Sequence, residues 1–214
     1  MGNPEPLVKI KPFRFLDLPP DIRQEIYILT VASPDAGVVD LNPLHDEHRF
    51  PSFPHDLLLA NQQIYHEIRS IYFSHNSFYL TIRHGHNKDL LPSLAPEFQD
   101  NRREIKSLHI WLQRWGANRF FLDSFAPAIE DMILNGKLRE LEVVINHPET
   151  LRYTQMGSLE LSENWRALKR ICRDPYLETV KLKAHGVKNF MRRNVVPRST
   201  GKHRDITWML SEPD

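Results

Sequence analysis

The sequence predicts a mixed α+β fold in which an N-terminal pair of helices leads into a small, mostly parallel β-sheet. Two observations carry this prediction. In the first third of the chain, apolar residues recur at helical spacing over 18–31 and 56–73. In the second half, three copies of the template L-x-x-L-x-L-x-L, which ends in the two-residue period of a strand, alternate with two helical patterns.

The first helix is predicted to begin at Leu18, because Pro19 and Pro20 suit a first turn that does not use the N–H groups that proline lacks. Asp21 falls in this turn, where a carboxylate meets the positive end of the helix dipole. Arg23 is placed on the polar face of the helix. The apolar residues that follow at helical spacing are Ile22, Ile26 and Leu29.

The second helix is predicted to begin at Asp56. Its core-facing stripe consists of Leu57, Ile64, Ile68 and Ile71. Glu67 is placed on the polar side and is interpreted as solvated. We expect the two helices to pack together because both carry an apolar stripe. The residues expected at this contact are Ile26, Leu29, Ile64 and Ile68.

Two strands are predicted beside these helices. Residues 37–41 form a short candidate strand, and the period changes to two over residues 77–82, with Phe78, Leu80 and Ile82 on one face. Histidines in the polar segments 43–54 and 83–87 suggest a metal, but neither segment supplies a complete ligand set. We therefore predict no metal site.

The template copies cover residues 105–112, 138–145 and 177–184. Between them lie helical patterns over 120–134, where Pro127 kinks or divides the helix, and over 161–172. Gly136 is predicted to cap the first of these helices, and residues 206–210 are a candidate last strand. Two interpretations remain open for this half, namely a leucine-rich-repeat-like stack and a plain sheet built from two βαβ crossovers.

The motif F-x-F-L-D followed by L-P-P-D-I-R-x-x-I-Y resembles the opening of the F-box-like domain of many fungal proteins. The later L-L-x-x-N-x-Q-I-x-x-E helix, within Leu57–Ile82, resembles the second signature of that family. The resemblance implies docking onto a Skp-type adaptor of a cullin-RING ubiquitin ligase, with the second half holding a client. The partner-binding residues would then be Leu18, Pro19, Ile22, Ile26 and Leu29, although the same face can instead be buried against the second helix.

Three segments are predicted from these patterns: an F-box-like helical module with a short strand over 1–83, a βα-unit domain over 84–186, and a basic C-terminal segment over 187–214. The chain has a net charge of +1, but Lys181–Arg204 contains eight Lys and Arg residues and no acidic residue. A nucleic acid is therefore an alternative partner. Its candidate contacts are the phosphate-binding Lys188, Arg192 and Arg193 and the base-stacking Phe190 and Trp208. The alternative is a solvated tail or nuclear import signal.

No enzyme motif is present, since the chain lacks a nucleophile elbow, a phosphate-binding glycine loop, H-E-x-x-H and a dinucleotide fingerprint. We predict a non-catalytic protein without cofactors, either an F-box-like interaction protein or a scaffold with no ligase link. Cys172 is the only cysteine, so an intrachain disulfide is excluded. We expect an intracellular protein, cytoplasmic or nuclear, because no signal peptide and no membrane-spanning apolar run of about 20 residues is found.

Overall fold

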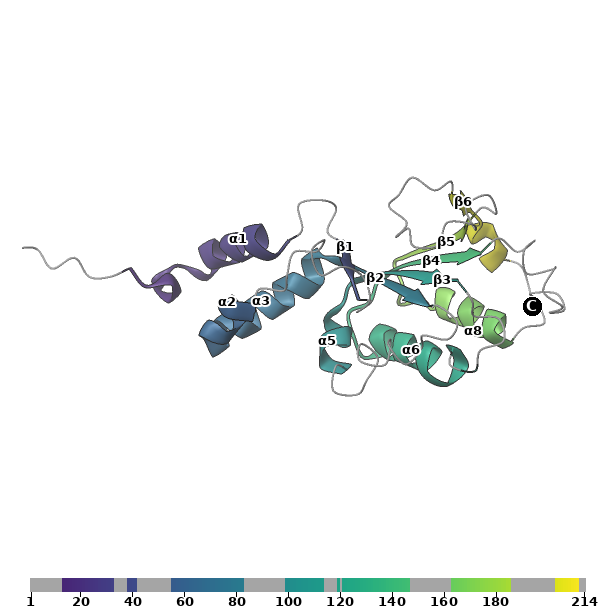
Figure 1. Ribbon diagram of the computed structural model, residues 1–214, viewed down its shortest axis with the longest axis horizontal. Helices are drawn as coiled ribbons and strands as arrows, with labels where there is room; N and C mark the ends of the chain where they lie inside the picture. Colours follow the sequence, from purple (N-terminus) through teal and green to yellow (C-terminus); the bar gives the residue numbers. More distant parts are fainter. Residues whose placement is uncertain are drawn as a thin grey trace, which may run out of the picture.

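The computed structural model describes residues 13–32, 38–41, 55–82, 99–113, 119, 121–146, 163–185 and 203–211. Within them, helices lie against one face of a six-stranded sheet, and a helical arm extends from one end of that sheet (Figure 1). The α-helices are α1 (Pro20–Val31), α2 (His55–Ala60), α3 (Gln62–His75), α5 (Gln99–Glu104), α6 (Ala126–Leu134) and α8 (Glu163–Cys172). The strands are β1 (Val38–Asp40), β2 (Ser77–Ile82), β3 (Ser107–Leu112), β4 (Glu140–Asn146), β5 (Thr179–His185) and β6 (His203–Asp205).

The strands lie in chain order, and β1 to β5 are parallel, so the predicted mixed fold with a mostly parallel sheet is confirmed. The last strand, β6, pairs antiparallel with β5. The three template copies are stacked in register, and β2 joins the same rows. These rows are Phe78, Leu108, Leu141 and Val180; Leu80, Ile110, Val143 and Leu182; and Ile82, Leu112, Ile145 and Ala184.

These rows form the interior of the protein, where nearly all their side chains are buried. Figure 1 shows α5, α6 and α8 as one layer beneath the sheet, and neighbouring helices of this layer contact each other. Each parallel strand follows a helix, from α1 before β1 to α8 before β5. This regular succession agrees with both predicted arrangements, a repeat-like stack and a sheet built from βαβ crossovers. The boundary predicted at 83/84 falls between β2 and β3, which are neighbours in one sheet.

Two elements of the second half differ in detail from the prediction. A short π-helical turn, η3 (Phe121–Phe125), precedes α6, and Pro127 lies in the first turn of α6, where its missing N–H costs nothing. Gly136 directly follows the C-cap residue Asn135, but its φ does not lie in the left-handed region, so it does not form the predicted glycine cap. It is required for close packing instead, because a Cβ atom there would lie 2.5 Å from the carbonyl oxygen of Met132 and 2.8 Å from that of Arg103.

The predicted strand over 206–210 is wrong. The strand comes earlier, in β6, and is followed by a 3-10 helix, η6 (Thr207–Leu210). The carboxylate of Asp205 accepts hydrogen bonds from the backbone N–H of Thr207 at 2.8 Å and from its hydroxyl at 2.7 Å. This local turn ends the strand.

The helical arm consists of η1 (Phe15–Asp17), α1, α2 and α3. The helix predicted over 56–73 is two helices, because Asn61 is extended and its side chain accepts a hydrogen bond from the N–H of Gln63 at 2.7 Å, which caps α3. In the arm, α1 and α3 run parallel, since Arg23 contacts Glu67 near their N-terminal halves and Val31 contacts Asn76 at their C-terminal ends.

The contact between α1 and α3 is not the predicted one. Ile64 and Ile68 are buried as expected, but Ile26 and Leu29 of α1 are 38% and 83% exposed. The inward residues of α1 are instead Arg23, Tyr27 and Val31, all at most 5% exposed. The apolar stripe of α1 therefore faces away from α3.

Asn76 closes the contact at the sheet end of the arm. Its buried side-chain amide donates hydrogen bonds to the carbonyl oxygens of Val31, at 3.0 Å, and Tyr72, at 2.8 Å. One side chain thus satisfies carbonyl groups in the last turns of both helices, which otherwise lack intrahelical partners.

The revised packing predicts opposite results for the same substitution at two isoleucines. Ile68→Ala should lower the free energy of unfolding by about 2–5 kcal/mol, because Ile68 is 0% exposed and its truncation leaves a cavity. Ile26→Ala should change it by less than about 1 kcal/mol. Urea denaturation measures both. Equal losses of unfolding free energy in the two variants would show that Ile26 is buried between α1 and α3, which would contradict the structure.

Candidate protein-binding surface

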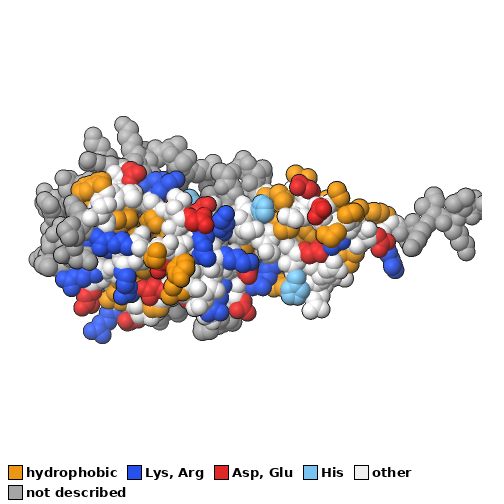
Figure 2. Space-filling model, turned by 180° about the vertical axis from the view of Figure 1, so that it is seen from behind, with side chains coloured by type: hydrophobic (Ala, Val, Ile, Leu, Met, Phe, Trp, Pro, Cys, Tyr) orange, Lys and Arg blue, Asp and Glu red, His pale blue; other side chains and the backbone are white. Residues whose placement is uncertain are grey.

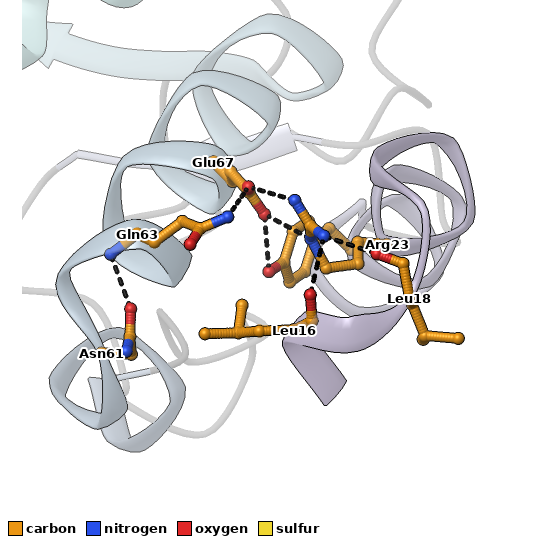
Figure 3. A network of polar contacts seen from close by, with 7 residues as sticks. Leu16, Leu18, Arg23, Asn61, Gln63 and Glu67 are labelled. Atoms are coloured by element: carbon orange, nitrogen blue, oxygen red, sulfur yellow. Dashed lines mark hydrogen bonds and ion pairs between the residues drawn. The ribbon is translucent and has the colours of Figure 1, made fainter. Parts of the chain in front are cut away.

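The arm is held together by a polar network that joins α1 to α3 (Figure 3). Arg23 forms a two-pronged ion pair with Glu67, its Nε donating to Oε2 at 3.1 Å and its Nη2 to Oε1 at 2.7 Å. Tyr27 donates its hydroxyl to Glu67 Oε2 at 2.9 Å, and Gln63 donates its amide to Oε1 at 2.9 Å. All four donors converge on one carboxylate, which is therefore well satisfied despite its partial burial.

The network changes the proton affinity of its members. Hydrogen bonding to Arg23 lowers the pKa of Glu67 to about 2, against the opposing effect of burial. Burial, assisted by the hydrogen bond to Glu67, raises the pKa of Tyr27 to about 12. Glu67 is thus a carboxylate and Tyr27 a neutral phenol over the whole physiological range. The prediction of a solvated Glu67 is wrong, because its side chain is only 29% exposed.

Arg23 also fixes the chain that enters α1. Its Nη1 donates to the carbonyl oxygens of Leu18 at 2.6 Å and Leu16 at 3.3 Å. The ring of Phe15 packs on Tyr27 with 5.5 Å between centroids. The guanidinium therefore holds η1 and the Leu18-Pro19 segment against α1. The prediction that Arg23 lies on the polar outer face is wrong, because the residue is buried.

The outer stripe, which we define as Ile22, Ile26 and Leu29, lies on the opposite side of α1 from this network. Their exposed fractions are 49%, 38% and 83%. At about 100° per residue, the three side chains fall within about 60° of one another and more than about 90° from Tyr27. Of the other two predicted partner-binding residues, Pro19 is exposed at the start of α1 and Leu18 is half-buried. The outer stripe and Pro19 are therefore accessible together.

Further large apolar side chains are exposed on the same arm. Figure 2 shows hydrophobic side chains gathered over the arm, on the right of the view. Among the described residues, those exposed on the arm outside the outer stripe are Phe13, Leu59 and Tyr65, and those exposed elsewhere are Leu134, Tyr176 and Trp208. The arm thus carries most of the exposed large apolar side chains, which is typical of a partner-binding region.

Among the described residues, polar side chains lie on the sheet face opposite to α5, α6 and α8. Lys183 Nζ binds Glu142 Oε1 at 2.6 Å, and His109 Nδ1 lies 4.0 Å from the same oxygen. Burial lowers the pKa of His109, and the charge of Lys183 adds to this effect while Glu142 opposes it. Trp111 packs its ring on that of His185, with 5.5 Å between centroids. On this face, therefore, the carboxylate of Glu142 is paired with Lys183, while the contact between Trp111 and His185 is one of ring packing.

The predicted nucleic-acid contacts are only partly covered by the structure. Lys188, Arg192, Arg193 and Phe190 lie outside the described residues, as do the histidines of the segments 43–54 and 83–87. Trp208, in η6, is 58% exposed. The neighbouring Thr207 hydroxyl accepts a hydrogen bond from the N–H of Leu182 at 3.0 Å, which places Trp208 beside the start of the basic stretch Lys181–Arg204.

The described residues hold no group of three or more His, Cys, Asp or Glu side chains that suits a metal ion. Burial raises the pKa of the Cys172 thiol to about 12, so this cysteine is a packed, protonated side chain at neutral pH. Among the described helices, none is long and apolar enough to cross a membrane. Comparison of the chain with protein-family models, curated proteins and solved structures gives no match.

Sequence reasoning missed the network of Arg23, Tyr27 and Glu67, although a signal for it exists. Arg23, Tyr27 and Val31 are spaced at i, i+4 and i+8, which is itself a helical face. Glu67 is three residues after Ile64 and four before Ile71, so it borders the buried stripe of α3. An arginine and a glutamate on the edges of two facing stripes are a candidate interhelical pair.

The lowered pKa of Glu67 predicts an acid-sensitive contribution to stability. The ionised carboxylate stabilises the fold above the ordinary pKa near 4.5, and this contribution is lost as the pH falls toward about 2. Glu67→Gln should therefore be less stable than the parent at pH 7 and should lose less stability between pH 4.5 and 2. The variant should still lose some stability over this range, because the hydrogen bond from Arg103 lowers the pKa of Asp131 to about 2 as well.

Chemical denaturation at a series of pH values measures this slope. Glu25→Gln, an exposed glutamate of the same arm, is the matched control and should follow the parent curve. If Glu67→Gln and the parent lost equal stability over this range, the ion pair with Arg23 would not form in solution.

Proposed function

We propose that the protein is a non-catalytic, F-box-like interaction module that docks a Skp-type adaptor through the outer face of α1. In this role it recruits a client protein to a cullin-RING ubiquitin ligase. The observation that carries the proposal is the exposure of the outer stripe on a helix whose other face is locked to α3. The resemblance of L-P-P-D-I-R-x-x-I-Y to the opening of the F-box-like domain favours a Skp-type adaptor as the partner.

The size of the outer stripe sets what it can contribute to binding. Full burial of one Leu or Ile side chain contributes about 1.5–3 kcal/mol, and micromolar affinity corresponds to about 8 kcal/mol. The three residues can therefore form the centre of an interface but need surrounding contacts. Phe13 and Pro19, both exposed just before α1, are candidates for such contacts.

The stacked sheet supports the second part of the role. Because α1 leads into β1 and α3 leads into β2, the arm and the sheet share one framework. A client held by the sheet would thus be placed at a defined distance from an adaptor held by the arm.

A second candidate function, nucleic-acid binding by the segment 181–204, is favoured by the exposure of Trp208 beside the start of that segment. An exposed indole offers a stacking surface for a base, and Lys181, exposed on β5, offers a phosphate contact. The third alternative is a scaffold with no ligase link. It predicts that the protein binds neither a Skp-type adaptor nor a nucleic acid.

The adaptor proposal predicts that Leu29→Asp abolishes binding. Leu29 is 83% exposed, so the variant should keep its circular dichroism and melting temperature. Buried in an interface, its unpaired carboxylate would cost several kcal/mol and weaken binding by about a hundredfold or more. Ile22→Asp should act in the same direction. Calorimetric titration with a recombinant Skp-type adaptor measures the loss.

The matched control is Leu134→Asp, because Leu134 is 61% exposed and also lies in the last turn of a helix, here α6. It should bind as the parent does. If a folded Leu29→Asp variant bound the adaptor with parental affinity, α1 would not be part of the interface. A parent protein that does not bind at micromolar concentration would rule out the ligase role.

The nucleic-acid candidate predicts a steep salt dependence. For single strands, the logarithm of the affinity should fall with the logarithm of salt concentration by about 0.7 per phosphate contact. Arg192→Glu with Arg193→Glu should flatten this slope, and Trp208→Ala should weaken binding with little effect on it. Filter binding with labelled RNA and DNA is the measurement. No retention of either by the parent at about 50 mM salt would exclude this function.

A further inference from the structure

The outer stripe of α1 has carboxylates along only one of its sides. At about 100° per residue, Glu25 lies about 60° and Asp21 about 100° from Ile22 in one direction, whereas the inward Tyr27 lies about 140° away in the other direction. Both carboxylates are exposed. We call Asp21 and Glu25 the acidic flank. Figure 2 shows acidic side chains beside hydrophobic ones over the arm.

No cation of the arm neutralises this flank. Arg23, the only basic residue of α1, points inward and is bound to Glu67. Among the described residues, neither Asp21 nor Glu25 has a hydrogen-bond or ion-pair partner. The helix dipole accounts for Asp21, which is in the first turn, but Glu25 is too far along the helix for this explanation.

The exposed charges of residues 13–32 are consequently those of Arg14, Asp17, Asp21 and Glu25, a balance of −2. We infer that the groove that receives α1 has an apolar floor and Lys or Arg side chains along the rim that meets the acidic flank. This inference rests on the proposed function, in which the outer face of α1 is the docking surface. Beyond the proposed function, the inference specifies the charge that the partner must carry. This charge would contribute to specificity separately from the apolar contact.

A second copy of this chain is a poorer occupant of the surface. In an antiparallel pair of α1 helices related by a two-fold axis, the two acidic flanks lie on the same side and repel each other. In a parallel pair, each acidic flank faces the other copy's Thr30 side, which carries no cation because Arg23 is buried. Neither arrangement compensates the charge.

The experiment compares two neutralising double variants with the same change in net charge. Asp21→Asn with Glu25→Gln removes the acidic flank, and Asp123→Asn with Glu178→Gln removes two exposed acids far from α1. Surface plasmon resonance with a recombinant Skp-type adaptor should show about three- to tenfold weaker binding for the first at about 50 mM salt, mainly through slower association. At about 500 mM salt, where the Debye length is roughly 4 Å, the difference should fall below about twofold.

The outcomes separate this inference from the proposed function. Parental affinity in the acidic-flank variant, with binding still abolished by Leu29→Asp, would overturn the charged rim and leave the docking proposal standing. Loss of affinity that is equal in both double variants would also overturn it, because net charge alone would be the cause. A Leu29→Asp variant that binds normally, or a parent that does not bind, would overturn the docking proposal and this inference together. Sedimentation velocity that shows a dimer abolished by Leu29→Asp would make a second copy the occupant.

Discussion

The ion pair between Arg23 and Glu67 fixes which face of α1 meets the rest of the protein. Arg23 is only 5% exposed, and its charge must be paired because an unpaired buried charge is strongly unfavourable. Glu67 provides two oxygens for it, and Tyr27 and Gln63 satisfy the same carboxylate. With Arg23, Tyr27 and Val31 inward, helical geometry places the stripe of Ile22, Ile26 and Leu29 outward. An internal electrostatic contact therefore determines the composition of the surface.

The same contact explains why the arm and the sheet form one framework. Parallel packing of α1 on α3 brings their C-terminal ends together, where Asn76 satisfies carbonyl groups of both. The following strands, β1 and β2, can then pair in parallel, and each later helix and strand extends the stack by one unit. The exposed face of α1 thus belongs to a framework that continues to β5.

Much of the sheet could be predicted from sequence, because its signal is local. The strand at Ser77–Ile82 is found with the predicted bounds, and the template copies form strands whose apolar positions are stacked in register. Alternation of buried and half-buried residues needs only neighbours along the chain to be recognised. Helix ends were less predictable, since the break at Asn61 depends on a single capping side chain.

The orientation of α1 could not be predicted in the same way. By hydrophobicity alone, Ile22, Ile26 and Leu29 are a better core face than one that contains Arg23 and Tyr27. Arg23 has an aliphatic stem and Tyr27 an apolar ring, so both pack well once their polar ends find a partner. That partner, Glu67, is 44 residues away from Arg23 in sequence. Patterns within one helix do not contain this information, and for the same reason the sequence left open whether Ile22, Ile26 and Leu29 are exposed or buried against the second helix.

Thiol labelling at two neighbouring positions of α1 tests this orientation most directly. Single cysteines are introduced by Leu29→Cys and Val31→Cys, whose native residues are 83% and 3% exposed. The buried Cys172, with its raised pKa, gives a low background. The account predicts that the cysteine at position 29 reacts with a maleimide at nearly the rate of the unfolded chain and that the one at position 31 is protected. Protection at position 29 with rapid labelling at position 31 would show that α1 presents the other face.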